Sequence, residues 1–327
     1  MDRRSFCLSL TAAGLGSALG SSSAFAQTFP SKLIRIVSPY AAGGGPDVQL
    51  RQFAPKFSGA IGQTMVVENK VGAAGVLAGQ YVAQAAPDGY TLLLGSNTHL
   101  LQKLLTPDLK FDPITEFVPI SNMTNLATVL VVRADSPYKR VEDLIAQLKA
   151  NPDKFNYGSG GVGTSAHLAG ATFVALCGSR AVHIPLKGSV EITASLLRGD
   201  TEFAFPVAST GVPQVKGGKL RALAVTSRVR LSQLPDVPTL NEVMKNDLTI
   251  QESWFGIWAP AKTPPDVVKI LFDATVKALA DPVLRQQFET AGGIAAPSES
   301  QEAFAVFVKR EYVKWGEIVK LSGTKAG

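Results

Sequence analysis

Residues 33–47 read LIRIVSPYAAGGGPD, and this stretch decides the fold class. A β-branched run ends at Ser38-Pro39, a pair that breaks a strand. A glycine-rich loop follows, and apolar residues then recur at helical spacing from Leu50 to Ile61, where Pro55 predicts a kink or a late helix start. The stretch therefore predicts a strand, a loop at its carboxyl end and a helix, which is the repeating unit of α/β proteins.

The same alternation of strands and helices continues in two sets. The first set adds strands over 65–68 and 91–94 and a helix over 76–86. The second set comprises predicted strands over 129–132, 155–158, 181–186, 202–205 and 220–225 and helices over 141–150, 164–177 and 190–197. One more strand, over 255–259, precedes a helical C-terminal third. We therefore predict an α/β fold of two similar lobes, with mostly parallel sheets covered by helices on both faces.

The composition excludes several classes of protein. The chain has 327 residues, 46% of them hydrophobic and 18% charged, which is enough for about two domains. No interior run approaches the ~20 apolar residues of a membrane span. Two cysteines and three histidines argue against a disulfide framework and against a metal enzyme. The net charge of +6 is spread without a long basic run, so we expect no nucleic-acid partner.

The first 26 residues have the features of a secretory signal peptide. Basic Arg3-Arg4 precedes an apolar region over 6–20, and Ala24-Phe25-Ala26 is a cleavage motif. The paired arginines also resemble a twin-arginine signal, so ordinary secretion and export after folding both stay open. We expect cleavage after Ala26 and an exported product. Its single remaining cysteine, Cys177, is expected to be a small buried hydrophobe.

Three predicted strands end in small, polar, glycine-containing segments, over 40–47, 95–98 and 158–165. Ligands of open α/β sheets bind beyond the carboxyl ends of strands, where glycine exposes main-chain N–H groups and a following helix favours an anion. These segments contain no Lys or Arg, and His167 and Lys187 are the only nearby candidates for a positive charge. They therefore predict a carboxylate site better than a phosphate site. The alternative is that they are turns that only connect elements.

The sequence offers little for catalysis. Gly158-x-Gly160-x-x-Gly163 matches the dinucleotide fingerprint, but the next strand ends without an acidic residue, and the first acid is Glu191 in the following helix. No nucleophile elbow or zinc motif occurs. We therefore expect no enzyme, no metal and no cofactor. A twin-arginine-exported oxidoreductase that binds a nucleotide cofactor at Gly158–Gly163 is the alternative.

Eight segments carry a resemblance to a known family. In chain order they are 39–47 (PYAAGGGPD), 67–75 (VENKVGAAG), 86–92 (APDGYTL), 156–164 (NYGSGGVGT), 185–188 (PLKG), 218–226 (GKLRALAVT), 234–240 (LPDVPTL) and 254–260 (WFGIWAP). They resemble segments of the TctC-like, or Bug-type, substrate-binding proteins of tripartite tricarboxylate transporters, and the resemblance covers essentially the whole chain.

The resemblance implies a two-lobed, hinged fold of the type II periplasmic-binding-protein kind. Lobe 1 would comprise 27–125 and 251–327, and lobe 2 would comprise 126–250. It further implies a monomeric periplasmic receptor that closes on a small carboxylate and delivers it to the membrane components of the transporter. A solute sensor that partners a signalling protein would share this fold.

In the family, one carboxylate of the ligand is held by the first loop of lobe 1 and the facing loop of lobe 2, with ordered water between. The matching positions in this chain are Tyr40, Ala42, Gly43, Gly44, Asp47, Ser96, Asn97, Thr98, Ser159, Gly163, Thr164, Ser165, His167 and Pro206. Pro206 stands where relatives commonly carry Asp, so we expect amino-acid ligands to be disfavoured. Dicarboxylates, tricarboxylates and aromatic acids stay open as ligands.

Overall fold

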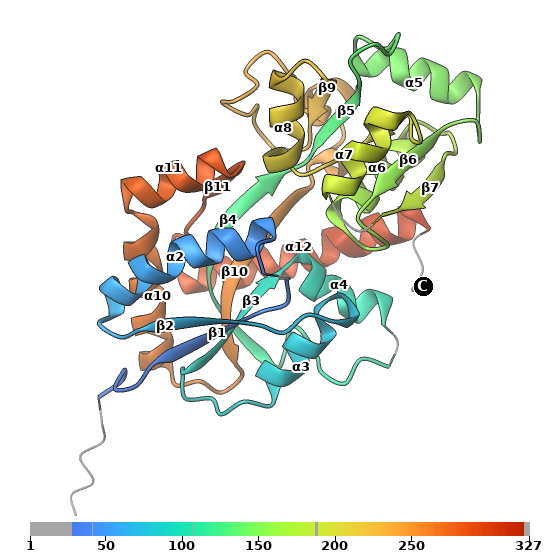
Figure 1. The fold of residues 1–327 in the computed structure, drawn as a ribbon. Coiled ribbons are helices and arrows are strands. Elements are labelled where there is room, and N and C mark those ends of the chain that lie inside the picture. The colour runs from blue at the N-terminus through green and yellow to red at the C-terminus, as the bar shows by residue number, and fades with distance from the viewer. Residues whose placement is uncertain (1–27, 41, 107, 187–188, 324–327) are drawn as a thin grey trace, which may run out of the picture.

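The computed structural model of the chain describes residues 28–40, 42–106, 108–186 and 189–323. The predicted signal segment and Lys187 lie outside these residues. The described chain forms two β-sheets, each flanked by helices, and the chain crosses from one sheet to the other and back (Figure 1). No helix in these four ranges combines the length and the hydropathy that crossing a bilayer requires.

The strands fall into two sheets. The first sheet has the order β11-β4-β10-β3-β1-β2, and the second has the order β7-β6-β8-β5-β9. Their bounds are β1 Ile34–Ser38, β2 Met65–Asn69, β3 Thr91–Ser96, β4 Phe117–Ala127, β5 Val129–Arg133, β6 Asn156–Ser159, β7 Val182–Pro185, β8 Phe203–Ala204, β9 Leu220–Val225, β10 Glu252–Pro260 and β11 Gly293–Ala295.

The helices connect and cover these strands. Their bounds are α2 Gly45–Ile61, α3 Val76–Ala83, α4 Asn97–Leu105, α5 Val141–Ala150, α6 Ser165–Leu176, α7 Ser189–Arg198, α8 Ala208–Lys216, α9 Leu240–Met244, α10 Pro265–Leu279, α11 Pro282–Thr290 and α12 Gln301–Ser322, with short 3₁₀ turns η1 Ala73–Gly75 and η2 Asp247–Thr249.

The alternation of side chains along the strands sends apolar residues to both faces of each sheet. In β1, Ile34 and Ile36 face the cluster under α2, α10 and α11, whereas Val37 faces the cluster under α3 and α12. In β5, Leu130 and Val132 face one cluster of the second sheet and Val129 and Val131 face the other. Both sheets are therefore buried on two faces, as the sequence predicts.

The sheets contain more antiparallel pairing than the sequence indicates. β2, β1 and β3 pair in parallel, and so do β7, β6 and β8, as expected for strand–helix–strand units. The connecting strands add antiparallel pairs, because β10 lies between β3 and β4, and β5 lies between β8 and β9. Each sheet is therefore mixed.

The two sheets are joined where β4 continues into β5 and where the chain returns into β10. The two passages are tied together at Thr128 and Thr226, which are both buried and whose hydroxyl oxygens are 3.0 Å apart. The Thr226 hydroxyl also donates to the carbonyl of Gln251 at 2.7 Å. Helix α12 then lies across the junction, where it contacts α4 beside the first sheet and α6 beside the second (Figure 1).

Candidate functional site

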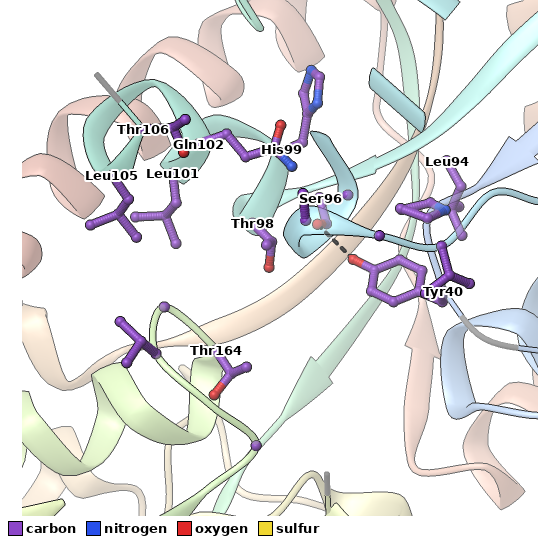
Figure 2. A pocket seen from close by; sticks show the side chains of 18 of the residues that line it. Tyr40, Leu94, Ser96, Thr98, His99, Leu101, Gln102, Leu105, Thr106 and Thr164 are labelled. Carbon is purple, nitrogen blue, oxygen red and sulfur yellow. Dashed lines mark hydrogen bonds between the residues drawn. The ribbon is translucent and has the colours of Figure 1, made fainter. Parts of the chain in front are cut away.

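A cavity of about 450 Å³ lies between the two sheets. It is lined by the residues after β1, the turn before α3, the end of β3, the length of α4 and the loop between β6 and α6 (Figure 2). The lining residues are Pro39, Tyr40, Val71, Gly72, Ala73, Gly75, Leu93, Leu94, Ser96, Thr98, His99, Leu101, Gln102, Leu105, Thr106, Gly160, Val162, Gly163 and Thr164. The volume falls in the usual range of small-molecule sites.

Hydroxyl groups gather at one side of this cavity. The Tyr40 and Ser96 hydroxyl oxygens are 2.8 Å apart, and Thr98 follows on the first turn of α4 (Figure 2). Burial raises the pKa of Tyr40 to about 12, although its hydrogen bonds with Ser96 and Thr98 act in the opposite direction. Tyr40 therefore keeps its proton at neutral pH, and this group of three hydroxyls can donate hydrogen bonds to an anion.

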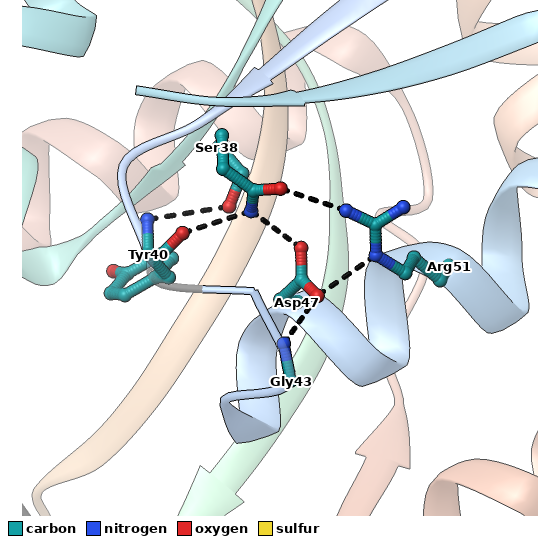
Figure 3. A network of polar contacts seen from close by, with 6 residues as sticks. Ser38, Tyr40, Gly43, Asp47 and Arg51 are labelled. Atoms are coloured by element: carbon teal, nitrogen blue, oxygen red, sulfur yellow. Dashed lines mark hydrogen bonds and ion pairs between the residues drawn. The ribbon is translucent and has the colours of Figure 1, made fainter. Parts of the chain in front are cut away.

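The loop that carries Tyr40 is held from behind by a buried carboxylate (Figure 3). Asp47 accepts hydrogen bonds from the Gly43 N–H at 2.8 Å, from Arg51 Nε at 2.9 Å and from Asn69 Nδ2 at 2.6 Å. Asn69 also donates to the Tyr40 carbonyl at 2.9 Å. Burial alone would raise the pKa of Asp47, but these hydrogen bonds outweigh it and lower the pKa below its ordinary value.

Asp47 therefore shapes the loop and does not face the cavity. Its carboxylate already accepts the hydrogen bond of the Gly43 N–H, a group that the sequence predicts to bind the ligand. Arg51 pairs with this carboxylate, so the loop brings no unbalanced negative charge next to the site.

The opposite wall is the loop between β6 and α6. Thr164 is the N-cap of α6 and accepts from the backbone N–H of His167, while its hydroxyl donates to the Gly161 carbonyl at 2.8 Å. The Gly163 N–H donates to His167 Nδ1 at 3.2 Å. Gly161 and Gly163 have φ values of +111° and +78°, which favour glycine. His167, on helix α6, thus holds the loop from behind.

His99 and His167 are buried, His183 is half-buried, and all three are neutral at pH 7. Burial lowers the pKa of His167 to about 4, and the neighbouring His183, whose ring centroid is 4.1 Å away, lowers it further. Burial also lowers the pKa of His183, whose Nε2 lies 2.6 Å from the Ser159 hydroxyl. Burial lowers the pKa of His99 to about 4, against hydrogen bonding to the Pro113 carbonyl and the charge of Asp112. None of them supplies a positive charge at neutral pH.

The cavity brings together Tyr40, Ser96, Thr98, Gly163 and Thr164 from the residues expected at the site. The others lie behind its walls. Asn97 Nδ2 is 3.5 Å from the Ser165 hydroxyl, which is hydrogen-bonded to Ser253 of β10.

The remaining expected residues lie further from the cavity lining. Ala42, Gly43 and Gly44 lead into α2, Ser159 and His167 brace the second loop, and the Pro206 carbonyl accepts from the Val129 N–H at 3.0 Å. The roles of these residues in ligand binding stay predictions.

Sequence reasoning missed the apolar part of the lining. Thr98, Leu101 and Leu105 are spaced i, i+3 and i+7 on α4 and so share one helix face, which borders the cavity. The spacing of these three residues in the sequence indicates such a helix face. It was missed because a loop was predicted over 95–98, where the helix in fact begins. In fact Gly95 and Ser96 end β3, and α4 begins at Asn97 without an intervening loop.

Charge is scarce around the cavity. Within the described residues, the lining includes no Lys, Arg, Asp or Glu. No group of His, Cys, Asp or Glu suited to a metal ion occurs in that same part of the chain. The arrangement can therefore bind a carboxylate through neutral donors, with a neighbouring apolar surface for the rest of the molecule.

A family model and curated relatives match this chain over most of its length. A family described as the tripartite tricarboxylate transporter family receptor matches residues 49–324. The UPF0065 protein in the gbd 5' region of Cupriavidus necator is 38% identical over 292 residues, which cover 88% of each chain. Protein BugT of Bordetella pertussis is 30% identical over 305 residues, which cover 92% of each.

Solved structures are similar over nearly the whole chain. Periplasmic binding protein BugD has a TM-score of 0.78 at 31% identity, with 91% of this chain and 100% of that one covered. MatC from Rhodopseudomonas palustris, with bound malate, has a TM-score of 0.76 at 27% identity, with 89% and 100% covered. Another R. palustris protein, solved with adipate, has a TM-score of 0.80 at 27% identity, with 91% and 100% covered. The likeness thus includes both sheets and the walls of the cavity.

Proposed function

Because this chain belongs to the receptor family of tripartite tricarboxylate transporters, we propose that it is a periplasmic receptor that binds a small organic carboxylate between its two sheets. The observation that carries the proposal is the group of hydroxyls on Tyr40, Ser96 and Thr98, which lies across the cavity from Thr164 (Figure 2). Hydrogen bonds from neutral donors to an ionised carboxylate are charge-assisted and stronger than those between neutral groups.

The ligands of two structural neighbours support the chemical class. One was solved with malate and the other with adipate, and both of these ligands are carboxylic acids. The scarcity of charged groups around the cavity of this chain fits the same class better than a phosphate, which commonly requires arginine or lysine.

The receptor works by closing on its ligand and then docking on the membrane components of a transporter. Residues 27–125 with 251–327 act as one lobe and 126–250 as the other, and the passages at Thr128 and Thr226 are the hinge. The receptor acts as a monomer, without catalysis and without a cofactor. A ligand that contacts both walls favours the closed form, because it binds that form better than the open one.

Thermal denaturation with mono-, di- and tricarboxylates tests the proposal. A ligand at 100 times its dissociation constant adds about 2.7 kcal/mol of stability, and each kcal/mol raises the melting temperature of a domain of this size by roughly 2–4 °C. We expect a clear rise with at least one carboxylate and none with NAD, NADP or FAD. Stabilisation by a nucleotide cofactor alone would contradict the proposal.

Two conservative variants test the hydroxyl group directly. Tyr40→Phe and Thr98→Val each remove one donor, so we expect the ligand to bind about 10- to 100-fold more weakly. Tyr81→Phe, on α3 outside the cavity lining, removes a hydroxyl of the same kind and should leave the affinity unchanged. Equal affinities for all three variants and the unmodified protein would place the ligand elsewhere.

Export can be tested separately from binding. Material purified from the periplasm should begin at Gln27, as mass spectrometry of the intact chain will show. A product that keeps residues 1–26, or that stays in the cytoplasm, would contradict the assignment to the periplasm.

A further inference from the structure

The cavity changes its chemical character along helix α4. Ser96 and Thr98 lie at the start of this helix, beside the Tyr40 hydroxyl, and Leu101 and Leu105 lie on its later turns, away from Tyr40 (Figure 2). A helix rises about 1.5 Å per residue, so the span from Asn97 to Leu105 is about 12 Å. The cavity therefore has a polar end and an apolar end, separated by about the length of a small organic acid.

The apolar end is closed by packed side chains. Leu101 is only 1% exposed and belongs to a cluster with Leu168 of α6 and with Trp315 and Ile318 of α12. Leu105 reaches the opposite wall, since a Cβ built on Gly163 would lie 3.0 Å from its Cδ1. A group at this end would contact these apolar side chains, with the polar side chains of Gln102 and Thr106 beside them.

Two exposed valines continue the apolar surface at the rim. Val71 comes from the first lobe and Val162 from the second, and their exposed fractions are 55% and 45%. Because they lie on opposite walls of the cavity, an apolar ligand between them would remove both from water. Each buried CH₂ group contributes about 0.8 kcal/mol, so this contact favours a ligand with a hydrocarbon body.

A second carboxylate would find no positive charge at the apolar end, where the polar side chains of α4, Gln102 and Thr106, are neutral. Among the described residues that line the cavity there is no cationic side chain, and His99 stays neutral at physiological pH. An ionised carboxylate that loses water among mostly apolar side chains is disfavoured. The two ends of the cavity are thus suited to two different groups on the ligand.

We propose that the ligand is a monocarboxylic acid with an apolar body, either aromatic or aliphatic, whose carboxylate lies at Tyr40, Ser96 and Thr98 and whose body lies along Leu101 and Leu105. This inference rests on the receptor function proposed above and narrows it. It separates this chain from its neighbours that were solved with the diacid adipate and with malate.

Calorimetric titration with matched acids tests the inference. The pairs are 4-methylbenzoate against terephthalate and hexanoate against adipate, in which a methyl group stands in place of the second carboxylate. We expect the monoacid of at least one pair to bind at least about tenfold more tightly than its diacid, because the diacid places a second negative charge among mostly apolar side chains.

A cation placed at the apolar end should change this preference. We expect Leu105→Arg to shift the ratio of the two affinities by at least about tenfold towards the diacid. Val162→Arg tests the same end from the opposite wall, at an exposed position where the substitution is compatible with folding. Val306→Arg, at an exposed position of α12 outside the lining, adds the same charge and should leave the ratio unchanged.

The outcomes separate the two proposals. A wild-type protein that binds the diacids as tightly as the monoacids, or more tightly, overturns the inference and leaves the receptor function standing. The inference is also overturned if the ratio of monoacid to diacid affinity is unchanged in both Leu105→Arg and Val162→Arg, provided that circular dichroism shows both variants to be folded. Failure of every carboxylate to bind contradicts the receptor function itself.

Discussion

Asp47 shows how a single buried side chain can prepare a binding loop without touching the ligand. Its carboxylate joins Gly43, Arg51 and Asn69, so the loop that presents Tyr40 is ordered before a ligand arrives. The substitution Asp47→Asn keeps the size but replaces one acceptor with a donor and removes the charge. We expect it to lower the free energy of unfolding by about 1–3 kcal/mol at pH 7, because the buried side chain at position 47 loses its charge-assisted hydrogen bonds with Gly43 and Arg51.

Urea denaturation at several pH values measures this effect. The pKa of Asp47 is depressed in the folded state, so its contribution is present above the unfolded value of 3.8 and is lost as the pH falls through the folded value. The difference in unfolding free energy between the variant and the unmodified protein should therefore become smaller in acid. Asp266→Asn, at an exposed acid in the first turn of α10, is the control and should change little. A gap that is absent at pH 7 would show that the network adds nothing.

The buried histidines predict a loss of stability in mild acid. His99 and His167 have folded pKa values of about 4, against 6.5 when unfolded, so the unfolded chain binds more protons between these values. The free energy of unfolding therefore has its full value above pH 6.5. It falls towards pH 4 by about 1.4 kcal/mol per pH unit for each histidine.

His99→Phe tests this dependence. The phenyl ring keeps the contacts of the imidazole with Phe111, Phe117 and Trp258 but cannot be protonated. Between pH 6 and 5, we expect the slope of unfolding free energy against pH to be smaller by about 1.4 kcal/mol per pH unit, which corresponds to one proton. An unchanged slope would mean that His99 does not titrate in this range, whatever the variant does to stability at pH 7.

Individual site residues are predictable where a strand ends. Tyr40 and Ser96 follow apolar runs in the sequence, so their place at a sheet edge could be anticipated. Leu101 and Leu105 could not be assigned in the same way, because an apolar helix face packs equally well against a core or beside a ligand. Asp47 was expected to contact the ligand, since the sequence does not show that Arg51 and Asn69 occupy its oxygens.

At the scale of elements, close packing of helices on strands depends on a few glycines. Gly170 lies in α6, where it packs on β6, and a Cβ at this position would be 2.4 Å from the ring of Tyr157. Tyr157 is only 3% exposed and is flanked by Phe203 and two histidines, so its ring has little room to move. The helix therefore approaches its strand only because the side chain is absent.

The variants Gly170→Ala and Gly59→Ala should have opposite effects. Alanine in place of glycine in a helix usually stabilises by about 0.5–1 kcal/mol, and we expect this at the exposed Gly59 of α2, where nothing lies within 4 Å of the added Cβ. At Gly170 we expect a destabilisation of about 1–3 kcal/mol from overpacking. Thermal unfolding of both variants measures the difference, and stabilisation by Gly170→Ala would disprove the close contact.

Elements with a regular pattern were the predictable ones. Asp281-Pro282 in the sequence indicates a helix start, and Asp281 does cap α11 by accepting from the Leu284 N–H. Strand β4 was missed, because Ser121, Asn122 and Asn125 interrupt its apolar pattern where it passes towards the second sheet. Helix α2 begins at Gly45 and continues through Pro55, so the late start considered from the sequence does not occur.

At the scale of the whole molecule, β10 and α12 hold the junction between the sheets. Glu311 of α12 accepts hydrogen bonds from the indole N–H of Trp254 at 3.0 Å and of Trp315 at 2.9 Å, and it pairs with Lys314 at 2.6 Å. The carboxylate is buried and thereby fixes the strand to the helix.

Loss of this carboxylate should weaken the junction. We expect Glu311→Ala to lower the free energy of unfolding by about 3 kcal/mol, since it leaves two buried indole donors and an ammonium group without their partner. Glu317→Ala, on the exposed side of the same helix, should change it by less than about 0.5 kcal/mol. Similar denaturation midpoints for the two variants would show that the indoles find other partners.

The general plan of the molecule follows from sequence patterning, but the junction does not. Alternation of strands and helices in two sets predicts two sheets, each buried on both faces. The pairing of β10 with both β3 and β4, and the lie of α12 against α4 and α6, depend on contacts between segments that are more than a hundred residues apart. A local pattern carries no information about such contacts.

The concentration of indole groups at this junction has a practical consequence for spectroscopy. Trp254, Trp258 and Trp315 are the only tryptophans in the chain, and all three are buried there, whereas residues 129–225 of the second sheet have none. Intrinsic fluorescence will therefore follow the first sheet and the junction, while far-ultraviolet ellipticity follows the whole protein. Coincident melting curves from the two signals will mean a single cooperative unit, and separate curves will mean that the half without indole groups melts on its own.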